Sequence, residues 1–518
     1  MTVNTVNRES KNLSSTQQLL ITIAVMSAAF MQVLDTTIVN VALPHMRSSL
    51  GATPDQISWA LTCYLVASGI CMPLTGYFSD ILGRKNYLLW CIGGFVVASA
   101  LCGISQSLTE IILYRILQGI FGAGLVPLSQ TILIDTYPPE SLGKAMAIWG
   151  AGIMLGPILG PTLGGYLTEI SSWRWTFYVN VPMGIAAFLL AWHVIIETPK
   201  KERRMDWLGL LLLSLGIGGT QYFIDRGNSE DWFNATNIKI AVVLAVTGFI
   251  GFIARELKHK KKSFFDIHIF KDRNFTVSSI ILLIVGIGLF GTMVIQPMFL
   301  EEQLGYPVLT TGLAIAPRGL SSMISMILVG KLINRFDPRL LMAIGIIIGS
   351  LGMWIGTFYS QDIGVTWIVW PSLLQGFGIG LIFVPLTAVA FATLPVAAKT
   401  EAAGLFSLIR TIGSSMGIAV ILTLFSRHGQ AAWNQLTGFI NPYNPNYAKY
   451  LASLHMSITD PRAIQLIAKE VAKQAQMMSF INVFTFIAWS FVVVLPLLLL
   501  LKKSTKQAAD VQDVAGTH

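Results

Sequence analysis

The sequence is poor in charged residues. Asp, Glu, Lys and Arg make up 12% of its 518 residues, about half of the roughly 25% that is usual for a soluble domain. Hydrophobic residues make up 53%, and the mean hydropathy is +0.65. This composition is typical of a polytopic membrane protein. The net charge of +9 does not indicate nucleic-acid binding, because the charges cluster in short loops between apolar runs.

Cysteines are few, and nucleotide-binding motifs are missing. The four cysteines have no metal-site spacing and lie in two apolar segments, where small side chains pack. The sequence has no G-x-x-x-x-G-K-[ST] loop and no soluble segment long enough for an ATPase domain. The seven histidines lie apart from catalytic partners. We therefore expect no ATP-driven pump, no enzyme, no cofactor and no metal site.

Long apolar runs dominate what is present. A membrane-spanning helix needs about 20 predominantly apolar residues. Segments of this kind predict an all-α polytopic membrane protein with 14 transmembrane helices. The predicted spans are 17–42, 55–77, 86–106, 109–133, 143–168, 176–196, 206–225, 238–256, 276–298, 311–333, 339–359, 366–392, 402–426 and 478–501.

Lys and Arg are distributed unequally between the two sets of loops. If the chain begins in the cytoplasm, the inner loops and tails hold 23 of the 35 Lys and Arg residues, and the short outer loops hold 4. Positive residues accumulate on the cytoplasmic side of membrane proteins. We therefore predict that both termini are cytoplasmic and that the basic inner loop 257–275 acts as a topology signal and contacts anionic lipid.

A short pattern recurs in two of the spans. Residues 117–119 (Leu-Gln-Gly) open a Gly-rich stretch that closes at Pro138, and residues 374–376 repeat the tripeptide in a stretch that closes at Pro395. The repeat predicts two related six-helix halves around a central path, as in alternating-access carriers; two unrelated Gly-rich helices are the alternative. The predicted parts are a tail 1–16, a first half 17–196, two inserted helices 206–256, the basic loop 257–275, a second half 276–501 and a tail 502–518.

One carboxylate, Asp35, lies near the middle of the first span. Such a group costs at least ~2.5 kcal/mol at the bilayer centre, faces the protein interior and marks an ion or proton path. Arg115, about one turn inside the span 109–133, stays charged and would stabilise the carboxylate if the two were close. The alternatives are an acid satisfied by its own helix and an arginine that reaches the outer face.

The turn after the span 55–77 carries a charged motif. It reads G-x-x-x-D-x-x-G-R-K, from Gly76 through Asp80 and Gly83 to Arg84. The glycines permit a tight turn and a close helix approach. Asp80 and Arg84 are placed to form a charged latch that stabilises one of two conformations. The alternative is a turn whose basic residues only set the topology.

The span 143–168 carries glycines four residues apart. Such a face lets another helix approach closely, and two prolines make the helix bendable. We expect this helix to bend at an interface between the halves, with packing alone as the alternative. The motif residues are Gly152, Gly156, Pro157, Gly160 and Gly164.

Taken in order, these motifs resemble the major facilitator superfamily. Residues 34–44 (LDTTIVNVALP) resemble the signature of its 14-span drug:proton antiporters, and the Gly-Pro motif resembles that of antiporters rather than symporters. Further segments, such as 270–276 (FKDRNFT) and 441–446 (NPYNPN), extend the resemblance to the EmrB-like branch of multidrug efflux permeases over nearly the whole chain.

The resemblance implies a function and partners. Members of this branch are bacterial inner-membrane permeases that expel hydrophobic compounds with the proton gradient, together with a periplasmic adaptor (membrane fusion protein) and an outer-membrane channel. The resemblance assigns proton coupling to Asp35 and Arg115 and the conformational latch to Asp80 and Arg84. It also makes the outer segment 427–477 an adaptor contact; the alternative is a segment that only caps the outer mouth.

Further polar residues within spans are candidates for the transport path. Arg318 and Arg410 either line the path and face an anionic group or pair structurally near the cytoplasmic side. The other candidates are Gln32, Gln118 and Gln375. The predicted function is proton-driven multidrug efflux. The alternatives are a dedicated exporter of a native metabolite, such as a siderophore or fatty acid, and a non-transporting membrane sensor.

Overall fold

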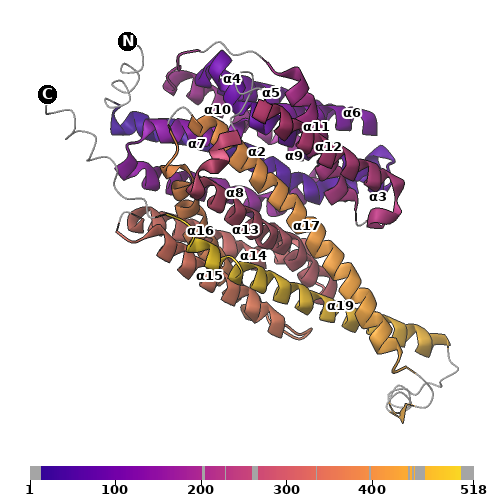
Figure 1. Cartoon of the computed structure of the whole chain (residues 1–518). Coiled ribbons are helices and arrows are strands. Elements are labelled where there is room, and N and C mark those ends of the chain that lie inside the picture. The colour runs from indigo at the N-terminus through magenta and orange to yellow at the C-terminus, as the bar shows by residue number, and fades with distance from the viewer. Residues whose placement is uncertain are drawn as a thin grey trace, which may run out of the picture.

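The computed structural model describes residues 13–200, 205–227, 229–258, 267–333, 335–395, 398–440, 444–445, 449 and 461–502. These residues form a bundle of long helices without strands (Figure 1). Fourteen helical segments in it are long and apolar enough to cross a membrane. The predicted all-α fold with 14 membrane helices is therefore confirmed. Residues 259–266 of the basic loop, most of both tails and the middle of the segment 427–477 lie outside the described residues.

The first half has six spans, three of which are built from more than one helix. We call the end of the bundle at which α2 begins the proximal end, and the opposite end the distal end. The elements are α2 (Ser15–Leu50), α3 (Pro54–Cys71) with η2 (Met72–Leu74) and α4 (Thr75–Leu82), α5 (Arg84–Ile104), α6 (Leu108–Gly122) with α7 (Leu125–Thr136), α8 (Pro139–Ile170), and α9 (Trp175–Tyr178) with α10 (Asn180–Val194).

The second half also has six spans, and two more helices precede it. The inserted pair is α11 (Trp207–Arg226) and α12 (Thr236–Lys258), with η3 (Trp232–Asn234) between them. The second half is formed by η4 (Ile267–Lys271), α13 (Arg273–Met298), η5 (Phe299–Gln303), α14 (Val308–Leu332), α15 (Pro338–Ile355), η6 (Gly356–Phe358), α16 (Thr366–Ala392), α17 (Lys399–Thr437), α19 (Pro461–Val492) and α20 (Leu495–Leu498).

Proline and glycine account for the breaks within the spans of the first half. Pro73 lies in η2, where the helix tightens, because proline has no N–H for an intrahelical bond. The break between α6 and α7 falls at Gly122 to Gly124. There a side chain on Gly124 would lie 2.8 Å from Cys91 Sγ on α5. Glycine at this point therefore permits close contact between helices.

The inserted helices pack on each other through small residues. A Cβ on Gly219 of α11 would lie 2.5 Å from the backbone oxygen of Ala241 on α12. At their proximal ends, Arg255 donates two short hydrogen bonds to Asp206, with Nε–Oδ2 and Nη2–Oδ1 distances of 2.7 Å. The hydrogen bonds from the Arg255 guanidinium hold the pKa of the Asp206 carboxyl below its usual value. The two helices therefore form a stable hairpin.

Helix α11 also touches both halves. Gln221 Nε2 donates to Ser415 Oγ of α17 at 2.7 Å. On the same helix, Ile217 lies 3.1 Å from the position of a Cβ on Gly69 in α3. The inserted pair thus lies at the side of the bundle where α3 and α17 meet.

The outside of the bundle is apolar. Trp90, Trp207 and Trp370 are 64%, 73% and 67% exposed, and many Leu, Ile and Val side chains are exposed beside them. A soluble monomer does not present apolar surface on this scale. The exposed apolar side chains therefore face lipid, whereas polar residues of the spans such as Asp35, Gln118 and Asn180 are buried.

Helices α17 and α19 extend beyond the rest of the bundle at the distal end (Figure 1). The 39 residues of α17 correspond to about 58 Å at 1.5 Å per residue, well above the roughly 30 Å of a bilayer core. The sequence placed the limits of these spans at 426 and 478, and both helices continue past those limits. Helix α19 begins at Pro461, within the segment 427–477.

Two neighbouring glycines of α11 provide a test of this packing. We expect Gly219→Ala to lower the free energy of unfolding by about 1–3 kcal/mol, because its Cβ would press on the α12 backbone. Gly218→Ala is the matched control, since its Cβ would lie 3.8 Å from Val66 Cγ1. Thermal unfolding in detergent measures both variants. Equal melting temperatures for the two would contradict the close α11–α12 contact.

Candidate functional site

A buried ion pair joins the first and fourth spans. Asp35 of α2 and Arg115 of α6 are each 0% exposed, and Arg115 Nη1 lies 2.6 Å from Asp35 Oδ2. The two residues come from segments 80 positions apart. The structure therefore brings together the two residues that the sequence proposed as a pair. In this apolar interior the attraction between the charges is much stronger than in water.

Two side-chain amides complete the shell of the carboxylate. Gln118 Nε2 and Asn180 Nδ2 each donate to Asp35 Oδ1 at 2.9 Å. Ser99 Oγ accepts from the same two amides, at 3.2 and 3.1 Å. Asp35 thus receives hydrogen bonds from α6 and α10 while a residue of α5 holds the donors in place. With Arg115, three N–H donors therefore contact the carboxylate.

The guanidinium of Arg115 is held on several sides. Its Nε donates to the backbone oxygen of Ala60 at 3.0 Å, and its Nη1 also donates to Gln118 Oε1 at 2.7 Å. The ring of Tyr64 lies 4.2 Å from the guanidinium carbon, which adds a cation–π attraction. The arginine is thus fixed by α3 and α6, and the reach toward the outer face that was considered for it does not occur.

Several buried polar atoms near the pair have no hydrogen-bond partner within the part of the chain that the structure describes. They are Arg115 Nη2, Tyr64 Oη, Asn180 Oδ1 and Gln32 Oε1. Gln32 lies on α2, about one turn before Asp35. Buried polar atoms of this kind are costly, so their presence around a single acid is typical of a functional site.

The glycines of the Leu-Gln-Gly repeat have matching neighbours in the two halves. A Cβ on Gly119 would lie 2.5 Å from the backbone oxygen of Tyr64 on α3, and a Cβ on Gly376 would collide with the backbone oxygen of Arg318 on α14. Arg318 therefore occupies, in the second half, the place that Tyr64 has in the first. The chance resemblance of two Gly-rich helices does not explain such matching contacts.

The counterpart of the ion pair is neutral. Ser372 precedes Gln375 by three residues, as Arg115 precedes Gln118. Ser372 Oγ accepts a hydrogen bond from Gln296 Nε2 of α13 at 2.9 Å. The second half thus has an amide and a hydroxyl where the first half has the buried acid and base.

At the proximal end, Arg84 connects the two halves. It forms an ion pair with Asp135 at the end of α7. Its Nη2 also donates to Thr400 Oγ1 of α17 at 3.3 Å. Asp80 lies one turn earlier on α4, close enough for its charge to act on Arg84. The sequence proposed Asp80 as the partner of Arg84, and the structure adds Asp135 and Thr400.

The glycines of this turn have separate roles. Gly83 has a φ of +86°, a conformation that glycine adopts readily, and a Cβ there would collide with Glu197. Glu197 accepts hydrogen bonds from the backbone N–H groups of Lys85 and Asn86. A Cβ on Gly76 would lie 2.5 Å from Glu401 Cγ of α17. Both glycines therefore allow close approach at the proximal end.

The glycines of the Gly-Pro motif face α2 of the same half. Gly156 packs on Val33 and Leu34, directly before Asp35, and Gly160 packs on Thr37. Gly152 and Gly164 lie along the same face, against Met26 and Ile38. The prolines Pro157 and Pro161 leave α8 continuous from Pro139 to Ile170. The glycine face therefore positions the helix that carries the acid.

The opposite side of α8 contacts α14 of the second half. A Cβ on Gly319 would collide with Ile158, and a Cβ on Gly330 would lie 2.7 Å from Ala147 Cβ. Helix α8 thus lies between the acid-bearing α2 and the arginine-bearing α14. The bending of α8 at this interface stays a prediction.

Sequence reasoning missed Asn180, Ser99 and Asp135. Asn180 opens the segment Asn-Val-Pro-Met-Gly. A polar residue at the start of an apolar span was the available signal. Among the described residues, no group of three or more His, Cys, Asp or Glu side chains has the geometry of a metal site.

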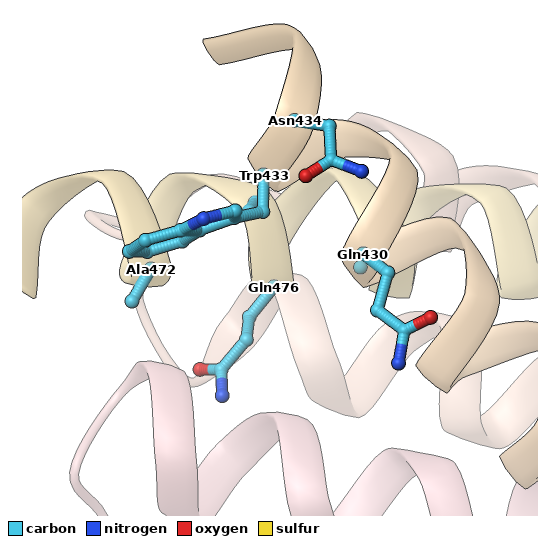
Figure 2. Close-up of a pocket in the computed structure, with 7 residues that line it drawn as sticks. Gln430, Trp433, Asn434, Ala472 and Gln476 are labelled. Atoms are coloured by element: carbon cyan, nitrogen blue, oxygen red, sulfur yellow. The ribbon is translucent and has the colours of Figure 1, made fainter. Parts of the chain in front are cut away.

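A shallow pocket lies on the distal extension of α17 and α19. Figure 2 shows Trp433 of α17 beside Ala472 of α19, with Gln430, Asn434 and Gln476 around them. The pocket lies between the distal parts of α17 and α19. The ion pair lies on α2 and α6, so the pocket belongs to the distal extension rather than to the buried site.

Comparisons with known proteins agree with this geometry. The family model described as Major Facilitator Superfamily matches residues 25–418. The chain is 34% identical over 496 residues to the multidrug export protein EmrB of Escherichia coli strain K12, covering 95% of this chain and 96% of that protein. It is 32% identical to the fatty acid resistance protein FarB of Neisseria gonorrhoeae, covering 93% and 96%.

A solved structure supports the fold. The crystal structure of the human organic anion transporter MFSD10 aligns with a TM-score of 0.60 and 15% identity, covering 93% of this chain and 99% of that chain. At this identity the likeness concerns the fold alone. The likeness extends over nearly the whole of both chains.

The buried pair predicts a measurable coupling between its members. We expect Asp35→Asn and Arg115→Gln each to destabilise the protein by about 3–5 kcal/mol, because either change leaves one charge buried and unpaired. The double variant should lose clearly less than the sum of the two single effects. Thermal unfolding of the three purified variants provides the measurement. Strict additivity would show that the two side chains do not interact.

Proposed function

Because this chain belongs to the Major Facilitator Superfamily, we propose that it exports hydrophobic or amphipathic compounds across a bacterial inner membrane in exchange for protons. The single observation that supports this proposal most is the fully buried pair of Asp35 and Arg115. A lone acid at this depth is typical of proton-coupled carriers. The relationship to the multidrug export protein EmrB supports multidrug efflux as the biological role.

Proton binding acts on the ion pair. A proton that reaches Asp35 from the outer side neutralises the carboxylate and weakens its hydrogen bond to Arg115 Nη1. The hydrogen bonds from Gln118 and Asn180 weaken with it, so the contacts of α2 with α6 and α10 loosen together. This change favours the return to the inward-facing state. Substrate binding from the cytoplasm or inner leaflet then favours proton release inward.

The proximal contacts of Arg84 act as the conformational latch. Arg84 holds Asp135 of the first half and Thr400 of the second half. Asp80 contributes its charge from the preceding turn. These contacts stabilise the arrangement in which the proximal ends of the halves are together, and they break when the halves separate there.

The distal extension of α17 and α19 is the surface on which we place a periplasmic adaptor. Two long helices that project from the bundle offer a rigid platform for another helical protein (Figure 1). In this arrangement the adaptor passes substrate to an outer-membrane channel. The proximal end, where the charged loops gather, then lies in the cytoplasm.

A second candidate function is the export of one native metabolite. The relationship to the fatty acid resistance protein FarB supports a fatty acid as such a substrate. A membrane sensor that does not transport is the third candidate. Movement of protons that depends on an added compound distinguishes a transporter from a sensor.

The coupling role of Asp35 is tested in liposomes that contain a pH-sensitive dye. We expect hydrophobic cations or amphipathic acids to drive proton movement through the wild-type protein. Asp35→Asn should lower that movement at least tenfold, because the side chain no longer titrates. Equal amounts of folded protein must be compared. Proton-coupled export at the wild-type rate in Asp35→Asn would refute the assignment.

Asp231→Asn is the matched control for this measurement. Asp231 is exposed in the distal loop between α11 and α12 and has a φ of +54°, which asparagine also tolerates. The same change of acid to amide outside the site should leave proton movement within twofold of the wild type. A loss in this control as large as that in Asp35→Asn would remove the specificity of the result.

The orientation is tested by labelling single cysteines. Asn234 is exposed at the distal end and Lys200 at the proximal end. On intact cells, a membrane-impermeant maleimide should label Asn234→Cys and not Lys200→Cys, and after lysis it should label both. The opposite pattern would reverse the proposed topology. The background variant replaces the four native cysteines, Cys63, Cys71, Cys91 and Cys102, by alanine.

A further inference from the structure

Arg318 is a buried positive charge that the proton-coupling site does not use. It is the eleventh residue of the 25-residue α14, about 15 Å from the helix start at 1.5 Å per residue. The residue is 5% exposed. Arg318 lies at about the same level of the bundle as Asp35. Helix α8 contacts Leu34, the neighbour of Asp35, through Gly156, and it contacts Gly319, the neighbour of Arg318, through Ile158.

The guanidinium of Arg318 has little to bind. Five N–H groups are available on an arginine. Among the described residues, Arg318 makes one long hydrogen bond, from Nη2 to the backbone oxygen of Leu289 at 3.4 Å. Helices α13, α14, α15 and α16 contain no Asp or Glu at all. No carboxylate of these four helices therefore compensates the charge.

The repeat shows that this charge is specific to the second half. Tyr64 has the equivalent place in the first half, where it lies over the guanidinium of Arg115. In the second half the ion pair is replaced by the neutral Gln296 and Ser372. The first half thus contains a compensated acid, and helices α13 to α16 of the second half contain a buried base with no carboxylate among them.

A second arginine lies closer to the proximal end. Arg410 is the twelfth residue of α17, about 16 Å along the helix, and it is half-buried. Within the described residues it forms no hydrogen bond or ion pair. Gly413, one turn later, packs on Leu283 of α13, whereas Arg318 binds Leu289, about 9 Å further along the same helix. Both arginines therefore lie beside α13.

We propose that Arg318 binds the negatively charged group of an amphipathic anion during transport, and that Arg410 contacts it earlier on the path from the proximal end. This inference rests on the proposed export function and adds a substrate class to it. A planar guanidinium with free N–H groups matches the oxygens of a carboxylate, sulfonate or phosphate. An apolar tail fits the apolar interior of the second half.

The anion site and the proton site lie in different halves. The anion therefore does not replace Asp35 on Arg115, and coupling comes from the movement of the halves around α8. Burying a charge without a partner is unfavourable, so an anion that pairs with Arg318 would lower the free energy of the complex. This cost gives binding at Arg318 a driving force that a neutral compound does not receive.

The test measures binding to the full-length protein in lipid nanodiscs by isothermal titration calorimetry, with empty nanodiscs subtracted. Decanesulfonate is the anionic probe, because its charge does not change with pH. Decyltrimethylammonium has the same tail and the opposite charge, and methanesulfonate has the same charge without the tail. We expect decanesulfonate to bind the wild type at least tenfold more tightly than methanesulfonate.

The variants assign that binding to Arg318. Arg318→Gln should weaken decanesulfonate binding at least tenfold and leave decyltrimethylammonium binding within twofold. Arg318→Lys should recover part of the affinity, because it keeps the charge and loses the planar fork. Arg47→Gln, at an exposed arginine near the distal end of α2, should bind as the wild type does. All four proteins are first compared by thermal unfolding.

Two outcomes would overturn the proposal. One is unchanged decanesulfonate binding in Arg318→Gln, and the other is an equal loss for both charged probes in both Arg318 variants. The binding measurement does not depend on transport. If decanesulfonate binds at Arg318 but no compound moves protons in liposomes, the proposed export function is wrong and the anion site is supported. If cations drive proton movement and decanesulfonate does not bind, the export function is supported and the anion site is wrong.

Discussion

The burial of Asp35 against Arg115 is the constraint on which the rest of the first half depends. An isolated charge in such an interior costs several kcal/mol, so neither residue is stable there without the other. Their hydrogen bonds extend the constraint to α3, α5, α6 and α10, which supply Ala60, Ser99, Gln118 and Asn180. In the proposed mechanism, a proton added to Asp35 would therefore affect four helices besides α2, and a local protonation change would become a change in helix packing.

Small residues transmit that change. The glycines of α8 let it lie directly on α2 next to Asp35, and its other side lies against Gly319 of α14. Helix α8 thus contacts the neighbours of both the acid in the first half and the arginine in the second. Packed helices have a few discrete arrangements rather than a continuous range. The same close contacts that stabilise the structure therefore link the two candidate binding sites.

The two halves share an arrangement of helices and differ in the charge of their buried residues. Gly119 and Gly376 have matching contacts, yet an acid and a base occupy the first half where an amide and a hydroxyl occupy the second. Under the proposed function, such a division would let one half respond to protons and the other recognise substrate. Arg84, at the proximal end, contacts both halves through Asp135 and Thr400, as the proposed latch requires.

The sequence alone determined the 14 spans, the buried acid, the repeat and the Gly-rich turn, because hydropathy and helical period are local properties of the chain. It also suggested Arg115 as the partner of Asp35, since an uncompensated charge at that depth is costly. Only the tertiary structure decided that Asn180 donates to Asp35, that Arg84 reaches Asp135 and Thr400, and that the glycines of α8 face α2. These partners lie from 51 to 316 positions apart. No local pattern records which helix faces which, because that choice depends on the packing of the whole bundle.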